Sequence, residues 1–83
     1  MGYILEIQPS KAFFKDNGEY GFSTKVKIKE KNQIKKLTVW DEKVKEIQKY
    51  KPGDFIEFIN VENKNNNGKI ENHVNLKSQI KKN

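Results

Sequence analysis

Apolar and polar residues alternate strongly in the middle of this chain. From residue 22 to residue 29, apolar or small side chains alternate with polar ones, most of which are lysines. The first group is Phe22, Thr24, Val26 and Ile28, and the second is Ser23, Lys25, Lys27 and Lys29. This period of two predicts a half-buried strand with one lysine-rich face. A second alternating stretch, residues 35–40, ends on Trp40, the only Trp in the chain. Since strand side chains alternate between faces, Trp40 should point away from its apolar neighbours.

The two stretches are predicted to form a hairpin with its turn at residues 31–33. With the turn centred near Asn32, the opposed pairs are Ser23 with Trp40, Lys25 with Thr38, and Lys27 with Lys36. Directly opposed residues share a face, so Trp40, Thr38 and the three lysines would form one outer surface. A slip of one residue would break this cluster.

Three further strands are expected around this hairpin. The first covers residues 3–8, with Tyr3, Leu5 and Ile7 on one face, and is interrupted at Pro9, which cannot donate to a ladder. It resumes at Phe13-Phe14 before a turn at Asn17-Gly18, the strongest short hairpin signal. Phe22, in the second strand, alternates with the inward residues and is expected in the core.

The fourth strand covers residues 55–61, with Ile56 and Phe58 inward and a break at Asn60. The fifth follows a polar turn at residues 63–68, with Ile70, Val74 and Leu76 on one face.

One short helix is predicted between the third and fourth strands. Asp41 suits its N-cap position, and Val44, Ile47 and Tyr50 form an apolar stripe at helical spacing. Pro52-Gly53 ends it. The sequence thus predicts an all-β fold with five strands and one helix in a single domain, residues 1–77, followed by a short, basic and frayed end, residues 78–83.

Composition narrows the class of protein. The net charge is +6, every basic residue is Lys, and such a positive field favours polyanionic partners. The chain has no Cys, which excludes disulfides and thiolate metal sites. No apolar run approaches the ~18 residues of a membrane span, and the N-terminus lacks the layout of a signal peptide. We therefore expect an intracellular protein with no membrane partner.

The element order and several residues resemble a known family. Five strands with a helix between the third and fourth is the order of the OB fold, a Greek-key barrel. Val39-Trp40-Asp41-Glu42, a short helix, and then Lys51-Pro52-Gly53-Asp54 resemble the signature of single-stranded DNA-binding proteins related to replication protein A, especially the simple archaeal ones. The resemblance covers about residues 3–77.

This resemblance implies where a ligand would bind. In that family a single strand lies on the outer surface of strands two and three, between two flanking loops, and the Trp that matches Trp40 stacks on a base. His73 matches a position that is aromatic in some relatives, although as a lone His without an acidic or metal partner it is expected at the surface. The loop from Glu62 to Asn67 lacks the aromatic residues that relatives carry there. The candidate site residues are Trp40, Lys25, Lys27, Lys36, Thr38, Phe14, Tyr20, His73 and Lys69.

Two functions remain open on the sequence alone. One is non-sequence-specific binding of single-stranded DNA, with RNA as a close variant, by base stacking and lysine–phosphate contacts. The other is a protein-interaction module, a small subunit of a replication or repair assembly. Self-association or contact with other replication proteins would fit either. Catalysis is not expected, because one His and no phosphate-binding Gly-rich loop leave no catalytic grouping. No cofactor or metal is implied.

Overall fold

Residues 2–82 are described by the computed structural model, apart from the side chain of Asn66. Within this range the chain forms strands and one short helix: β1 Gly2–Ile7, β2 Lys11–Phe14, β3 Tyr20–Glu30, β4 Gln33–Trp40, α1 Glu42–Ile47, β5 Phe55–Ile59, β6 Glu62–Asn66, β7 Lys69–Val74 and β8 Gln79–Lys82.

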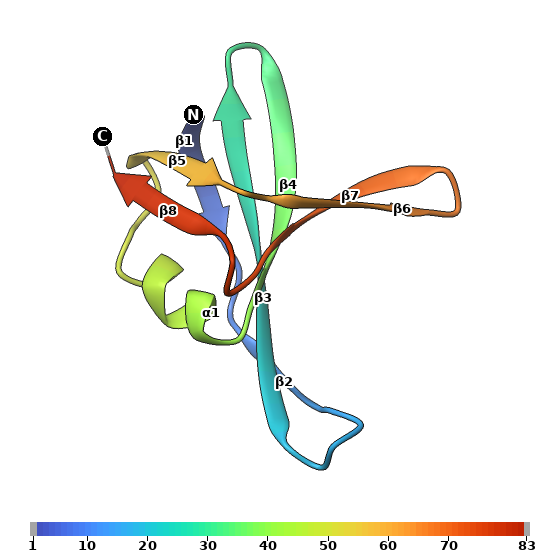
Figure 1. The fold of residues 1–83 in the computed structure, drawn as a ribbon. Coiled ribbons are helices and arrows are strands. Elements are labelled where there is room, and N and C mark those ends of the chain that lie inside the picture. Colours follow the sequence, from blue (N-terminus) through green and yellow to red (C-terminus); the bar gives the residue numbers. More distant parts are fainter. Residues whose placement is uncertain (1, 83) are drawn as a thin grey trace.

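The strands form one curled sheet in the order β6-β7-β4-β3-β1-β5-β8, with β2 on the free part of β3. All pairs are antiparallel except β4 with β7. Figure 1 shows the long hairpin β3–β4 through the centre, with the hairpins β2–β3 and β6–β7 projecting from the body. The first predicted strand is divided in two, and two strands that were not predicted, β6 and β8, form where the sequence suggested a polar turn and a frayed end. β1 and β2 separate around Pro9, and β5 and β6 separate at Asn60, whose φ is 60°.

The predicted register of the central hairpin is confirmed. Ser23 pairs with Trp40, Lys25 with Thr38, and Lys27 with Lys36. Because opposed residues share a face, the side chains expected to form one outer surface do share it.

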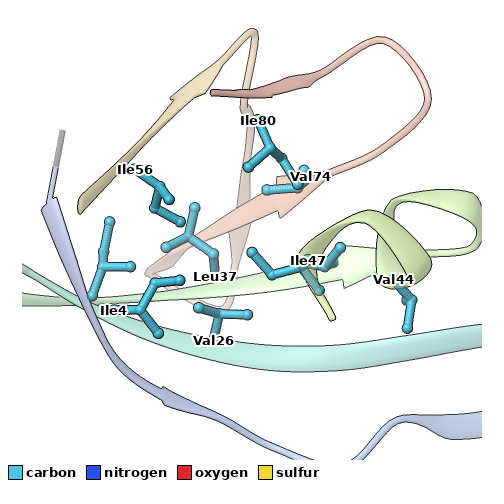
Figure 2. Packing of buried hydrophobic residues seen from close by; sticks show 10 residues of the cluster. Ile4, Val26, Leu37, Val44, Ile47, Ile56, Val74 and Ile80 are labelled. Atoms are coloured by element: carbon cyan, nitrogen blue, oxygen red, sulfur yellow. The ribbon is translucent and has the colours of Figure 1, made fainter. Parts of the chain in front are cut away.

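The core lies on the inner face of the sheet, under α1. Its buried members are all aliphatic: Ile4, Val26, Ile28, Leu37, Val39, Val44, Ile47, Ile56, Val74 and Ile80. Figure 2 shows most of these side chains converging from β1, β3, β4, β5, β7, β8 and α1. Val44 and Ile47 anchor the helix, as their spacing predicts, and Tyr50 packs against the cluster. Trp40 does not belong to the core.

The first strand corrects the alternation expected for it. Ile4 is the buried residue, whereas Tyr3 and Leu5 are exposed. The register of β1 against β3 shifts between Ile4 and Glu6. A bulge adds one residue to a strand and so reverses which faces the following residues take, which the alternation of Tyr3, Leu5 and Ile7 could not reveal.

Other expectations also prove wrong. Phe22 is 46% exposed, and Ile70 and Leu76 are exposed as well, because Phe22 and Ile70 lie in the projecting hairpins β2–β3 and β6–β7 and Leu76 lies in the turn after β7. The end of the chain is not frayed from residue 78: β8 pairs with β5, and Ile80 is buried. Asp41 precedes α1 but makes no side-chain cap hydrogen bond.

Candidate nucleic-acid interface

Trp40, at the end of β4, is held on two sides by other rings. The edge of Phe13 from β2 meets it at 90°, with ring centroids 5.5 Å apart. The ring of His73 from β7 lies within 22° of parallel to it, with centroids 5.7 Å apart. The indole Nε1 donates a 2.7 Å hydrogen bond to His73 Nδ1. Trp40 remains partly exposed, so its plane is fixed while part of the ring is open to a ligand.

His73 is not the unpartnered surface residue that the sequence suggested. It is 8% exposed, because its strand lies between β4 and β6, where it pairs with Thr38 and Glu62. Since Nδ1 accepts the indole hydrogen bond, the neutral ring carries its proton on Nε2. That nitrogen lies 4.0 Å from Glu71 Oε1. The carboxylate therefore favours the tautomer that can accept from Trp40.

Phe13 reaches Trp40 because its partner in the hairpin is a glycine. Phe13 pairs with Gly21, and a Cβ at Gly21 would lie 2.5 Å from Cζ of the Phe13 ring. A strand glycine often marks such a close approach. Any larger residue at this position would displace Phe13 from the edge of Trp40.

Asp41 connects the hairpin β2–β3 to the Trp40 end of β4. Its Oδ2 lies 3.0 Å from Lys15 Nζ, its Oδ1 accepts from the Phe22 N–H at 3.3 Å, and its own N–H donates to the Phe22 carbonyl at 2.7 Å. With φ of 53°, Asp41 turns the chain from β4 into α1. The residue expected to cap the helix instead fixes the hairpin beside Trp40.

The lysine face adjoins Trp40 along β3 and β4. Lys25 lies opposite Thr38, which is half-buried, and Lys27 lies opposite Lys36. Within residues 2–82 neither Lys25 nor Lys36 forms an ion pair, while Lys27 Nζ lies 3.7 Å from Glu6 Oε2. The two unpaired ammonium groups can therefore meet phosphates without first breaking an ion pair.

The rim beyond Trp40 carries two carboxylates, Glu62 and Asp41, and each is paired with a lysine: Glu62 Oε1 lies 3.9 Å from Lys64 Nζ, and Asp41 pairs with Lys15. Glu62 on β6 accepts a 2.9 Å hydrogen bond from Asn75 Nδ2. It lines, with Trp40 and Asp41, two adjacent hollows of about 220 and 330 Å³. These volumes are at or below the lower end of the ~300–1,000 Å³ typical of small-molecule pockets. The site therefore has a lysine-rich side along β3 and β4 and, at Trp40, an end where carboxylates and lysines are paired.

The structure does not bring every predicted site residue together. Phe14 pairs with Tyr20, their rings lie 4.4 Å apart, and the two residues are 70% and 64% exposed. As the neighbour of Phe13 in the strand, Phe14 points to the opposite face. Lys69 lies near the tip of the hairpin β6–β7, four residues before His73 and so about 13 Å away along β7. Sequence reasoning chose Phe14 and missed Phe13 as the contact to Trp40.

The residues that the structure describes contain neither a grouped set of metal ligands nor a membrane-spanning helix. Among residues 2–82, no three His, Cys, Asp or Glu residues are grouped so that they could hold a metal ion. Over the same residues, no helix has the length and apolar character needed to cross a bilayer.

No protein-family model matches the sequence, and no curated protein matches it. Solved structures do match the fold over nearly the whole chain. A replication factor A-related protein from Methanobacterium thermoautotrophicum has a TM-score of 0.82 at 23% identity, covering 99% of this chain and 76% of that one. The chain has an OB fold. The second OB-fold domain of replication protein A from Methanococcus maripaludis (TM-score 0.77, 21% identity, 98% of this chain and 76% of that one) is also similar.

An OB domain from Thermoplasma acidophilum has a TM-score of 0.74 at 16% identity, covering 99% of this chain and 70% of that one. At these identities the similarity establishes the OB barrel alone. The five predicted strands correspond to β1 with β2, β3, β4, β5 and β7, whereas β6 and β8 lie outside them.

Proposed function

We propose that this OB domain binds single-stranded nucleic acid without sequence preference, with DNA as the principal ligand and RNA as a close variant. The observation that carries the proposal is the position of Trp40. The ring is fixed by Phe13 and His73 and lies on the same face as Lys25, Thr38 and the lysines beyond them. Sequence-tolerant binding combines such an aromatic surface with a positive groove.

The charges suggest how a strand would lie. A base stacks on Trp40, and its phosphates run toward Lys25, Lys27 and Lys36 rather than toward Glu62 and Lys64, whose opposite charges lie 3.9 Å apart and offset each other. Thr38 supplies a hydroxyl between the ring and the lysines. Nothing in this arrangement reads base edges, so the binding is expected to tolerate any sequence.

The similar structures support a replication setting. Two of the three are domains of proteins named for replication factor A or replication protein A. We propose that this chain is likewise a binding module of DNA replication or repair rather than an enzyme. It would act on single strands, either through several copies or beside other replication proteins.

A second candidate function rests on a different surface. Phe14, Tyr20 and Phe22 leave apolar area exposed on the hairpin β2–β3, and the hairpin β6–β7 carries no Phe, Tyr or Trp. Exposed apolar area of this kind favours a protein contact. A protein-interaction module would bind its partner there and leave Trp40 without a ligand.

The test is to compare Trp40→Ala with Trp40→Phe. Losing one base stack should weaken binding by roughly 1–3 kcal/mol, whereas Phe retains an aromatic face and should retain much of the affinity. Binding is measured by anisotropy of a labelled 10-nucleotide single strand, with a duplex of the same sequence expected to bind less well because its bases are already stacked on one another. Equal affinity of folded Trp40→Ala and wild type would reject the proposal and favour the protein-interaction module.

A further inference from the structure

A second pair of aromatic rings lies at the other end of the sheet. Tyr3 of β1 and Phe55 of β5 are paired in the ladder, and their ring centroids are 4.7 Å apart at an angle of 42°. Tyr3 is 54% exposed, while Ile4 and Ile56, the adjacent residues in the two strands, supply the core. These rings are therefore not needed to fill the barrel.

The register places Tyr3 on the same face as the lysines beside Trp40. Tyr3 pairs with Lys29, and Lys29 pairs with Ile34. Lys29 follows Lys25 and Lys27 at intervals of two along β3, so all three point outward. One continuous face thus begins at Trp40, crosses the lysines and ends at Tyr3 and Phe55.

The length of this face suits a single strand. Trp40 is six residues along β4 from Ile34, or about 20 Å, and Tyr3 lies two strands away from Ile34, or about 10 Å. At the ~3.4 Å per nucleotide of a stacked strand, 20 Å corresponds to about six nucleotides, and to fewer in an extended strand. OB folds cover about 4–16 nucleotides, so one strand can reach both ends.

The charge around the second ring pair also favours a polyanion. A surface depression of about 1,040 Å³ is lined by Tyr3, Phe55 and the tip of the hairpin β3–β4. Lys29 and Lys31 belong to this lining and, within residues 2–82, form no ion pair, whereas Lys35 is 3.4 Å from Glu30. A second copy of the chain would bring like charges together here, which disfavours self-association through this face.

We propose that Tyr3 and Phe55 form a second base-contacting subsite, occupied by the distal part of a strand whose first base stacks on Trp40. The inference rests on the proposed function. It assigns the ligand a path along β3 and β4, with the phosphates over the lysines between the two ring clusters. Short strands then occupy the Trp40 end alone, and longer ones gain the second contact.

The test uses single strands of 4 and 10 nucleotides with wild type, Tyr3→Ala and Tyr3→Phe. Tyr3→Ala should bind the 10-mer at least about fivefold more weakly, the effect of losing one base stack, while Tyr3→Phe stays close to wild type. Both variants should bind the 4-mer as wild type does, with the same quenching of Trp40. Leu5→Ala is the matched control, since Leu5 is an exposed apolar residue of the same strand. It should leave both affinities unchanged.

Four other results would reject the inference that Tyr3 and Phe55 form a second subsite. If Tyr3→Ala leaves the 10-mer affinity unchanged while the 4-mer still quenches Trp40, the second subsite is rejected and the proposed function stands. An equal loss in Leu5→Ala would show that disturbance of β1, not loss of a ring, causes the effect. If Tyr3→Ala changes the sedimentation coefficient of the protein without changing its affinity for the 10-mer, the face would be assigned to self-association. If neither strand quenches Trp40 in wild type, both proposals are rejected.

Should Tyr3→Ala unfold, Tyr3→Leu keeps the apolar bulk without the ring and gives the same comparison.

Discussion

In the proposed function Trp40 stacks on a base, so its ring must hold one plane in the absence of the ligand, and at the residue scale His73 provides this order. The 2.7 Å hydrogen bond from the indole Nε1 to His73 Nδ1 fixes the ring about its side-chain torsions. Phe13 meets the ring from another side. A base that arrives at the site therefore does not have to order the indole, which lowers the entropic cost of binding.

Replacing His73 should show how much this order contributes. His73→Phe keeps a ring of similar size but removes the acceptor, so binding of a single strand should weaken about two- to tenfold, the effect of a hydrogen bond worth ~0.5–1.5 kcal/mol. His73→Asn offers a side-chain oxygen near the position of Nδ1 and should recover part of the loss. Affinity and the anisotropy of Trp40 emission are measured together. Identical values for wild type and His73→Phe would contradict the positioning role.

At the scale of elements, the site depends on how the hairpin β2–β3 is attached. Asp41 holds it through Lys15 and both backbone groups of Phe22. This attachment keeps Phe13 against Trp40, because Phe13 lies in the same hairpin. In the proposed function the Trp-Asp pair has two separate tasks: the ring would bind the ligand, and the carboxylate holds the neighbouring hairpin.

Asp41→Ala removes both side-chain contacts and should cost about 1–2 kcal/mol of unfolding free energy, the sum of a surface ion pair and a hydrogen bond. Asp41→Asn keeps an oxygen for the Phe22 N–H and should cost less than about 1 kcal/mol. Urea unfolding gives the two values, and hydrogen exchange of the amides in residues 11–22 should accelerate more in Asp41→Ala. Equal exchange in wild type and Asp41→Ala would show that the hairpin is held by other contacts.

The two hairpins show what the sequence could and could not predict. The register of β3–β4 was predictable because a long alternation on both sides of one short turn allows a single pairing that buries the apolar set. In β2–β3, a two-residue loop at Asn17-Gly18 would place Phe14 opposite Gly21. The observed connection spans residues 15–19 and places Phe13 there instead. A one-residue difference reverses the faces, so that Phe13 rather than Phe14 lies opposite Gly21 and faces Trp40.

The sequence pattern could not predict contacts that form only in the tertiary structure. The bulge after Ile4 puts Tyr3 and Ile7 on opposite faces of β1, and the position of β7 between β4 and β6 buries His73 beside Trp40. Neither follows from local alternation, because both depend on the pairing of strands far apart in the chain. The second ring pair and the support of Trp40 therefore required the structure.

At the scale of the whole molecule, the charge is unevenly arranged around the proposed path. Lysines lie along β3 and β4, whereas beside Trp40 the carboxylates of Glu62 and Asp41 are paired with Lys64 and Lys15. Binding should therefore be driven by a small number of phosphate contacts rather than by the net charge of +6. With about three contacts, from Lys25, Lys27 and Lys36, the logarithm of the binding constant should fall with log salt at a slope near −2, since each phosphate neutralised on a single strand contributes ~0.7.

The most direct measurement of the central claim is the emission of Trp40 during titration with a 10-nucleotide single strand at several salt concentrations. The only Trp of the chain reports stacking, and the salt series counts phosphate contacts. We predict saturable quenching with a slope near −2, and a slope about 0.7 shallower in Lys25→Gln. Unchanged Trp40 emission at low salt, under conditions where the protein is folded, would contradict the assignment of this face to single-stranded nucleic acid.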